Sequence, residues 1–425
     1  RLPEVNFFYY LGELRRLKLS QNRLKVLPEN EFQYLRSLEV LEMEMNKIEV
    51  FPSYCNNLTN LKRLDISNNK LTKLPESMGC CMNLKFFNAH SNYLGFLPSS
   101  LGGCFNLEYI DVSRNELKEV PEDIGFMASL KHFDANSNRI GHLPRDIGNC
   151  SKLKYIDFSN NIMVFLPESF SMLEALEICN MERNELIMQP GRLSNCTSLK
   201  DLRLKNNKTR AITDDVGSCS GLLRFDVSNN LVAEIPPEIG LCVMLQELDL
   251  SYNEMAHVPP ELASCGMIQI LDLRYNQIEG MFPETIGLVE SLVKLDMSFN
   301  KITALPEAIV GLRRLEILKA EHCQLRSLPN TITDLVKLHF LELSGNHFTR
   351  FPIELSDLKS LKTLNMLNNG MDLLPRAIDR MTQLTTLNLS RNILKALPVE
   401  FVRILESVPE VDLAKNPWNA LPNKW

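Results

Sequence analysis

Apolar residues recur along the chain in the spacing Leu-x-x-Leu-x-Leu, and each copy of this phrase ends in a polar residue. Within a copy, apolar and polar positions alternate, which is the period of a β-strand with one buried face. In the copy that covers residues 107–115, the alternation predicts that Ile110 and Val112 point inward. Tyr109, Asp111 and Ser113 are then expected on the opposite face.

An asparagine closes almost every copy, and we call this place the ladder position. It holds Asn22, Asn46, Asn69, Asn92, Asn115, Asn138, Asn161, Asn184, Asn207, Asn230, Asn253, Asn276, Asn300, Cys323, Asn346, Asn369, Asn392 and Asn416. Fourteen of the 17 intervals between these 18 residues are 23 residues long, and three are 24. This regularity predicts one repeat domain of 18 copies, whereas a length of 425 residues would by itself indicate two or three domains.

A proline stands six residues after the ladder position in 16 of the 18 copies. Thr213 replaces it once, and in another copy it moves by one place to Pro283. We expect the proline on the return from the strand, where its fixed φ is useful and no backbone donor is required. The inward asparagine is expected to hydrogen-bond the backbone of the turn, and Cys323 is expected to bond more weakly.

The unit Leu-x-x-Leu-x-Leu-x-x-Asn-x-Leu-x-x-Leu-Pro-x-x-Ile-Gly resembles the leucine-rich repeat over essentially the whole chain. Its 23-residue length and Leu-Pro-x-x-Ile-Gly phrase are similar to the intracellular, Ras-group subclass. The resemblance implies an α/β fold, a right-handed solenoid or horseshoe with a concave parallel β-sheet. Within a single domain over residues 1–425, we expect a truncated copy or cap at 1–13 and regular repeats at 14–398. An irregularity is expected at 280–283, and the final repeat and cap at 399–425.

The last part of the chain carries features of a terminal cap. Residues 399–407 are expected to form a helix, and Trp418 and Trp425 are expected to cover the open edge of the core. The amino-terminal part offers only the aromatic run Phe7, Phe8, Tyr9 and Tyr10.

Ten of the 11 cysteines occupy core positions of the repeat rather than a disulfide framework. Seven of them stand 11 residues before a ladder position: Cys81, Cys104, Cys150, Cys196, Cys219, Cys242 and Cys265. Because other copies hold leucine or methionine there, these cysteines are interpreted as small buried apolar residues. The pattern predicts a reduced protein in the cytoplasm and disfavours an extracellular receptor.

Charge and motifs exclude several classes of function. The chain has 46 basic and 52 acidic residues, which disfavours nucleic acid as the main partner. No uncharged apolar run approaches the ~18–20 residues needed to cross a bilayer, so membrane insertion is not expected. We find no catalytic constellation, no phosphate-binding glycine loop and no metal-ligand spacing, so an enzyme, a cofactor and a metal are not expected.

The outward position four residues before the ladder is mostly acidic. It holds Glu42, Asp65, Asp111, Asp134, Asp157, Asp226, Asp249, Asp272, Asp296, Glu342 and Asp412. These carboxylates are interpreted as solvated residues of a common repeat phrase. A basic group interrupts them, formed by Arg183, Arg203, Lys205 and Arg224, with Lys200 and Lys208 nearby in sequence. This basic group either docks acidic or phosphorylated parts of a partner or neutralises neighbours such as Asp201 and Asp226.

Two stripes of outward aromatic residues are the other candidates for a protein-binding site. The first stripe is Phe86, Tyr109, His132 and Tyr155, continued by Ile178, and the second is Tyr252, Tyr275 and Phe299. Such rings either form hot spots for a protein partner or stack across neighbouring strands. The hypothesis is that a protein ligand lies along the concave face over both stripes and the basic group. Tyr109→Ala together with Arg203→Glu is expected to abolish its capture.

The function expected from the sequence is a non-enzymatic scaffold or adaptor that binds a protein on its concave face in intracellular signalling. The family resemblance implies a small GTPase or a phosphatase complex as partner. Two alternatives remain open: a targeting or sensor region of a larger signalling enzyme, and a structural subunit of a cytoskeletal or ciliary assembly.

Overall fold

The computed structural model describes residues 11–188 and 193–418. Its chain forms two compact units that meet in sequence between Thr209 and Arg210, and each is described by itself below. The expected single domain stays a prediction. The aromatic run before residue 11, Pro190, Pro422 and Trp425 lie outside the described residues.

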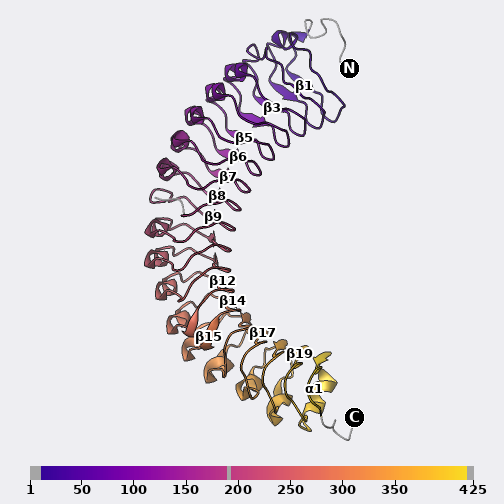
Figure 1. Cartoon of the computed structure of the whole chain (residues 1–425), viewed down its shortest axis with the longest axis vertical. Helices are drawn as coiled ribbons and strands as arrows, with labels where there is room; N and C mark the ends of the chain where they lie inside the picture. Colours follow the sequence, from indigo (N-terminus) through magenta and orange to yellow (C-terminus); the bar gives the residue numbers. More distant parts are fainter. Residues whose placement is uncertain (1–10, 189–192, 419–425) are drawn as a thin grey trace. The chain divides into compact units, whose positions relative to one another are not determined.

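The first unit is a ladder of short parallel strands joined by returns that contain 3-10 helices (Figure 1). Its strands are β1 (Arg16–Lys18), β2 (Val40–Glu42), β3 (Arg63–Asp65), β4 (Phe86–Asn88), β5 (Tyr109–Asp111), β6 (His132–Asp134), β7 (Tyr155–Asp157), β8 (Ile178–Asn180) and β9 (Asp201–Arg203). Its 3-10 helices are η2 (Phe32–Tyr34), η3 (Glu76–Cys80), η4 (Ser99–Gly103), η5 (Glu122–Phe126), η6 (Arg145–Asn149) and η7 (Glu168–Met172).

The second unit repeats this arrangement. Its strands are β10 (Arg224–Asp226), β11 (Glu247–Asp249), β12 (Ile270–Asp272), β13 (Glu279–Met281), β14 (Lys294–Asp296), β15 (Lys301–Ala304), β16 (Ile317–Lys319), β17 (Phe340–Glu342), β18 (Thr363–Asn365), β19 (Thr386–Asn388) and β20 (Glu410–Asp412). The helices are η8 (Asp214–Ser218), η9 (Pro237–Leu241), η10 (Pro260–Ser264), η11 (Glu284–Leu288), η12 (Glu307–Gly311), η13 (Asn330–Asp334), η14 (Ile353–Asp357), η15 (Arg376–Arg380) and α1 (Phe401–Ser407).

Successive strands pair in parallel and in register, so each column of the repeat becomes a row across the sheet. Tyr109 lies beside His132, and Asp111 lies beside Asp134. In the second unit, Asp249 lies beside Asp272 in the same way. Within each unit the strands line one side and the 3-10 helices line the other (Figure 1). The predicted repeat solenoid with a parallel sheet is therefore confirmed.

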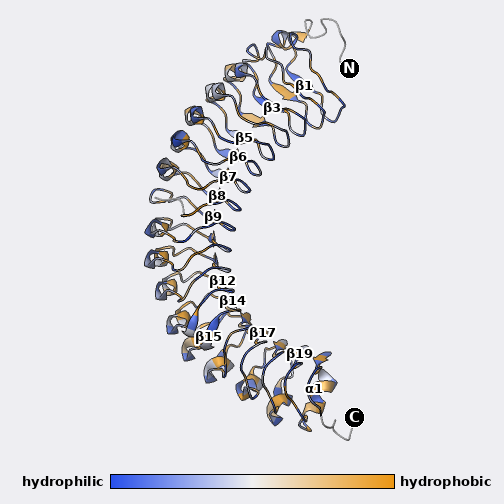
Figure 2. Cartoon of the chain, viewed as in Figure 1, coloured by the Kyte–Doolittle hydropathy of each residue, from blue (hydrophilic) through white to orange (hydrophobic). Residues whose placement is uncertain are grey.

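The core lies between the strands and the 3-10 helices. Ile110 and Val112 are completely buried, as the alternation predicts, and so is Ile124, the third residue of η5. In Figure 2, hydrophobic and hydrophilic residues alternate within the turns of both units. One turn cannot bury its apolar side alone, so each turn takes its core contacts from its neighbours.

The ladder asparagines form hydrogen bonds with backbone groups of the turn that follows each strand. The side-chain amide of Asn115 donates to the carbonyls of Ala89, Val112 and Ser113, over 2.9–3.1 Å. Its carbonyl oxygen accepts from the backbone N–H of Leu94 at 3.0 Å. The Sγ of Cys323 in the same column contacts the carbonyl of Met297 at 3.3 Å. The expected role of the column, and the weaker bonding of Cys323, both appear in the structure.

The residue just before the ladder position has a left-handed backbone in every copy. Tyr252, for example, has φ of 55°, and Gly345 has φ of 65°. Such a conformation is uncommon outside glycine, so the ladder bonds must hold it in place. It turns the chain away from the strand, and it places the second aromatic stripe on the turn rather than on the strand.

The prolines adopt the expected backbone conformation, and the irregular copies change the structure only locally. Pro121 has φ of −66° and precedes η5. Thr213 takes the same extended conformation before η8, so the copy without proline keeps its helix. The 24-residue copy at 280–283 adds a small parallel pair, β13 with β15, in which Gly280 has φ of 78°. Near the end, α1 begins two residues later than expected, at Phe401.

Candidate protein-binding face

The strand face of each unit, meaning the outward side chains of its strands and of the turns that follow them, carries the candidate residues. In the first unit, four of these side chains form one continuous stack, which we call the first stack. It runs Phe86–Tyr109–His132–Tyr155, with ring centroids 4.5, 4.4 and 4.2 Å apart and interplanar angles below 10°. The in-register pairing of β4 to β7 causes it, because it places equivalent residues on neighbouring strands.

The first stack is capped at one end by a cation. The guanidinium of Arg63 lies 3.7 Å from the ring centroid of Phe86, which is a cation–π contact. Arg63 is held there by Glu42, whose carboxylate lies 3.0 Å from its Nε. The sequence reasoning missed Arg63, although it occupies the same column as the stacked rings, one copy earlier.

Partial burial changes the acid–base behaviour of the first stack. Desolvation raises the pKa of Tyr109 to about 12 and also raises the pKa of Tyr155. Desolvation lowers the pKa of His132, although the charges of Asp111 and Asp157 oppose this effect. At neutral pH the stack is therefore an uncharged aromatic surface, which suits contact with a protein.

The second unit carries a similar row, which we call the second stack. Tyr252, Tyr275 and Phe299 lie parallel at centroid distances of 4.3 and 4.1 Å, and His322 extends the row at 4.9 Å. His322 was missed, although the first stripe already contained a histidine, His132. Both stripes thus stack across neighbouring copies, and their role in binding a partner stays a prediction.

The acidic column has a structural role that the sequence interpretation missed. Each aspartate accepts a hydrogen bond from the backbone two residues later, as Asp111 does from the N–H of Ser113 at 3.0 Å. Several of these carboxylates are buried, including Asp296 with 2% of its surface exposed, so the expectation of plain solvated side chains was wrong. The recurring phrase Asp-x-Ser was the available signal, because serine and aspartate close such turns locally.

Burial, together with neighbouring carboxylates, raises the pKa of two members of the column. Burial raises the pKa of Asp134 to about 6, and the charges of Asp111 and Asp157 act in the same direction. Burial, with the charges of Asp249 and Asp296, likewise raises the pKa of Asp272 to about 6. Each unit thus holds its own row of carboxylates beside its aromatic stack.

We expect Asp134→Asn to stabilise the protein at neutral pH. Asp134 is ordinarily ionised above pH 3.8, but its pKa in the folded state is about 6. Between these values the folded state binds more protons than the unfolded state, so the stability falls as pH rises through this window. Asparagine keeps the turn bond, as Asn88 and Asn180 do in the same column. The expected gain is about 1 kcal/mol in the free energy of unfolding.

Urea unfolding of both proteins at pH 7.5 and pH 3.5 measures this effect. The gain should be present at pH 7.5 and should shrink at pH 3.5, where most of the aspartate is protonated in both states. An equal gain at the two pH values would show that the carboxylate charge is not its cause.

Four of the six basic residues are paired with carboxylates. In the first unit, the guanidinium of Arg203 lies 2.6 Å from the carboxylate of Asp201 on the same strand. Lys200 pairs with Glu177 at 2.8 Å, and Lys208 pairs with Glu185 at 3.1 Å. Lys205 lies half-buried and Arg183 exposed in the same unit. Charge neutralisation, which the sequence left as an alternative, therefore operates at Arg203.

Arg224 belongs to the second unit, where its Nε lies 2.6 Å from the carboxylate of Glu247. The docking of a partner by these basic residues stays a prediction. The pairings reduce the positive charge that a partner would meet, because exposed pairs of this kind satisfy each other.

The described residues offer no group of three histidine, cysteine, aspartate or glutamate side chains placed to hold a metal ion. No helix in that part of the chain has the length and apolar character needed to span a membrane. All 11 cysteine thiols are free, and ten are buried while Cys80 is partly exposed. Burial raises the pKa of Cys104 and of Cys150 to about 12, so these thiols stay protonated in the core.

Comparisons with known proteins agree with the fold. Leucine-rich-repeat models match residues 4–48, 60–81 and 267–325, and a model of the BspA-type leucine-rich-repeat region matches residues 145–237. A search of curated proteins finds no match. A leucine-rich-repeat protein of Leptospira interrogans is 29% identical with a TM-score of 0.74, and the match covers 95% of this chain and 97% of that one.

Two plant structures are also similar. The ectodomain of the Arabidopsis thaliana receptor kinase GASSHO1/SCHENGEN3, in complex with CASPARIAN STRIP INTEGRITY FACTOR 2, is 28% identical with a TM-score of 0.75. That match covers 96% of this chain, which spans only 53% of the receptor chain. The ectodomain of the Arabidopsis receptor kinase HAESA, in complex with an IDA peptide hormone ligand, is 26% identical with a TM-score of 0.71, over 94% of this chain and 70% of that one.

Proposed function

The chain belongs to the leucine-rich-repeat proteins, and we propose that it is a non-enzymatic scaffold that binds a protein partner on the strand face of its first unit. The first stack carries this proposal. Its four rings lie outside the core, and they stand half-buried on a face that no other described segment of the first unit covers (Figure 1). Rings exposed in this way typically form the hot spots of protein interfaces.

The geometry of the first stack indicates how a partner meets it. The ring faces cover one another, so the ring edges, the Tyr109 hydroxyl and the His132 nitrogens are available. The carboxylates of Asp111, Asp134 and Asp157 run beside the rings in the next outward column. A partner segment that lies across β4 to β7 would therefore contact a row of ring edges bordered by a row of carboxylates.

Site-specific photo-crosslinking tests this proposal. The full chain carries benzoylphenylalanine either at Phe86, at one end of the first stack, or at Phe126 on η5, whose side chain is 66% exposed. Each protein is irradiated in extract of the cells that make it. We expect a discrete protein adduct at position 86 and none at position 126, because η5 lies on the other side of the unit from the strands.

Two matched variants separate binding from stability. Tyr109→Ala removes the ring next to Phe86 and should lower the adduct at position 86 at least tenfold. Tyr275→Ala removes the middle of the second stack, with the loss of two similar ring contacts, and should leave the adduct unchanged. Full adduct yield with Tyr109→Ala, or an adduct at position 126 alone, would rule out the first stack as the binding site.

We also propose that the protein works in intracellular signalling in the cytoplasm, with a small GTPase or a phosphatase complex as partner. The free, buried thiols support a reducing compartment, because a disulfide framework is the usual device of extracellular repeat proteins. Mass spectrometry of the adduct at position 86 identifies the partner. An adduct with a secreted or cell-surface protein would contradict this part of the proposal.

A second candidate is a ligand-sensing region of a larger protein. The similarity to two receptor-kinase ectodomains that hold peptide or protein ligands favours it. The full reading frame separates the two candidates, since a kinase or another catalytic domain next to these repeats would support the second. In both cases the strand face is the surface that meets the ligand.

A further inference from the structure

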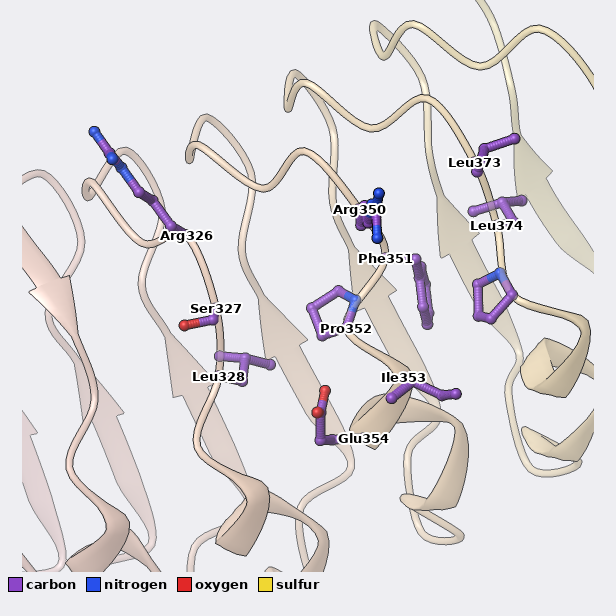
Figure 3. Close-up of a pocket in the computed structure, with 11 residues that line it drawn as sticks. Arg326, Ser327, Leu328, Arg350, Phe351, Pro352, Ile353, Glu354, Leu373 and Leu374 are labelled. Atoms are coloured by element: carbon purple, nitrogen blue, oxygen red, sulfur yellow. The ribbon is translucent and has the colours of Figure 1, made fainter.

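A groove lies on the second unit, away from its strand face. It has a volume of about 650 Å³ and runs over three successive return segments, as Figure 3 shows. These segments follow β16, β17 and β18; the first and third precede η13 and η15, and the second runs into η14, which begins at Ile353. The groove is lined by residues 326–328, 350–354 and 373–375. None of them belongs to a strand, so the groove is separate from the face discussed above.

The floor of the groove is apolar and belongs to the core of the repeats. Leu328, Phe351 and Leu374 are buried, with 5–8% of their surface exposed. Two further apolar side chains stand at its mouth, Ile353 with 57% and Leu373 with 59% of the surface exposed. A volume of about 650 Å³ lies within the range of about 300–1,000 Å³ that is typical of ligand pockets.

One of the two apolar residues at the mouth, Ile353, replaces a residue that is often acidic in other copies. The position just after the repeat proline often holds glutamate, as in Glu29, Glu76, Glu122, Glu168, Glu284 and Glu307, but here it holds Ile353. The position two residues before the proline holds exposed apolar residues in several copies, among them Val26, Val50, Phe96 and Phe165, and Leu373 continues that column here. The core does not require either residue, because both side chains remain largely in solvent.

The rim of the groove carries an excess of positive charge. Arg326 and Arg350 are exposed, and neither guanidinium forms an ion pair with any residue that the structure describes. Figure 3 shows both arginines along one side of the groove and Glu354 on the other. On a chain with a net charge of −6, two unpaired arginines beside an apolar groove select for carboxylates.

We propose that this groove binds an extended peptide segment of a partner protein, in which aliphatic side chains stand next to aspartate or glutamate. The aliphatic side chains cover Ile353 and Leu373, and the carboxylates pair with Arg326 and Arg350. The row of three return segments suits an extended chain rather than a compact ligand. This inference is independent of the proposed strand-face function, since the two surfaces share no residue.

Peptide display on the full chain tests the proposal. A random dodecapeptide library is selected on the wild-type protein, and enriched peptides are synthesised with a fluorescent label for binding by fluorescence polarisation. We expect enriched sequences that combine aliphatic residues with aspartate or glutamate. The double variant Ile353→Glu with Arg350→Glu should weaken their binding at least tenfold.

The control carries the same change in charge elsewhere on the second unit. It is Val336→Glu with Arg313→Glu, both exposed and both outside the groove. Its binding should equal that of the wild type, as should that of Tyr109→Ala on the first unit. Circular dichroism of all variants verifies that they are folded.

Four outcomes would overturn the proposal. They are selection of no peptide, selection of basic peptides, equal binding by the groove variant and the wild type, and equal loss in the groove and control variants. Sedimentation velocity tests one other possible occupant of the groove, a second copy of this chain. A wild-type dimer that the groove variant abolishes would assign the groove to a second copy of this chain and would also overturn the proposal.

Discussion

Asn115→Ala is expected to lower the free energy of unfolding by about 3 kcal/mol. The side chain of Asn115 makes four hydrogen bonds to backbone groups of two neighbouring turns, over 2.9–3.1 Å. Alanine would leave the buried N–H of Leu94 without its acceptor and three carbonyls without one donor each. An unsatisfied buried group costs about 1–3 kcal/mol, and partial relaxation of the turn limits the sum.

The control for this prediction lies in the same column. Asn22 is exposed, and among the described residues its amide donates only to the carbonyls of Leu19 and Ser20. Because water can replace these bonds, we expect Asn22→Ala to cost less than about 1 kcal/mol. Urea unfolding measures both costs, and hydrogen exchange should show lost protection at the Leu94 amide. Equal costs for the two variants would mean that the ladder bonds do not stabilise the turn.

Gly311→Ala is expected to destabilise the second unit by about 2 kcal/mol, as overpacking of a well-packed site does. Gly311 ends η12, and a Cβ there would collide with the backbone carbonyl of Gly287 in η11. The obstacle is backbone rather than a flexible side chain, so the two helices would have to separate. Neighbouring turns depend on each other for burial, and the separation would therefore expose core on both sides.

The matched substitution is Gly141→Ala, because a Cβ at Gly141 would meet no atom within 4 Å. We expect no loss there, and even a small gain, since alanine restricts the unfolded chain. Thermal unfolding followed by circular dichroism compares the two variants. If both changed the midpoint equally, the close approach of η11 and η12 would not explain the presence of glycine at Gly311.

The repeat could be predicted from the sequence because each copy contains the same pattern of apolar, polar and proline positions. The alternation around Ile110 and Val112 predicts their burial, and the column of prolines predicts the extended entry into each return. The predictions from sequence were wrong where one residue pattern had two physical causes. Aspartate in the acidic column was interpreted as solvated, but the same residue closes the turn by accepting the backbone N–H two residues later, as Asp111 does from Ser113.

The sequence predicted only part of the candidate site. The first stack follows directly from equivalent positions in neighbouring copies, once these copies are in register. Arg63 was missed because its side chain is not aromatic, and His322 was missed although it occupies the column of the second stack. The groove was missed because it depends on how Ile353 and Leu373, 20 residues apart in sequence, come to stand at one mouth.

The sequence by itself determined the repeat, its register and the identity of the inward and outward columns. A 23-residue copy can bury its leucines only against the next copy, and every repeat carries the apolar positions that make this packing possible. The tertiary structure decided which polar groups are available to a partner. Arg203 is tied to Asp201, whereas Arg326 and Arg350 are unpaired within the described chain. The pairing of a charge depends on side-chain geometry between neighbours, which the order of residues does not specify.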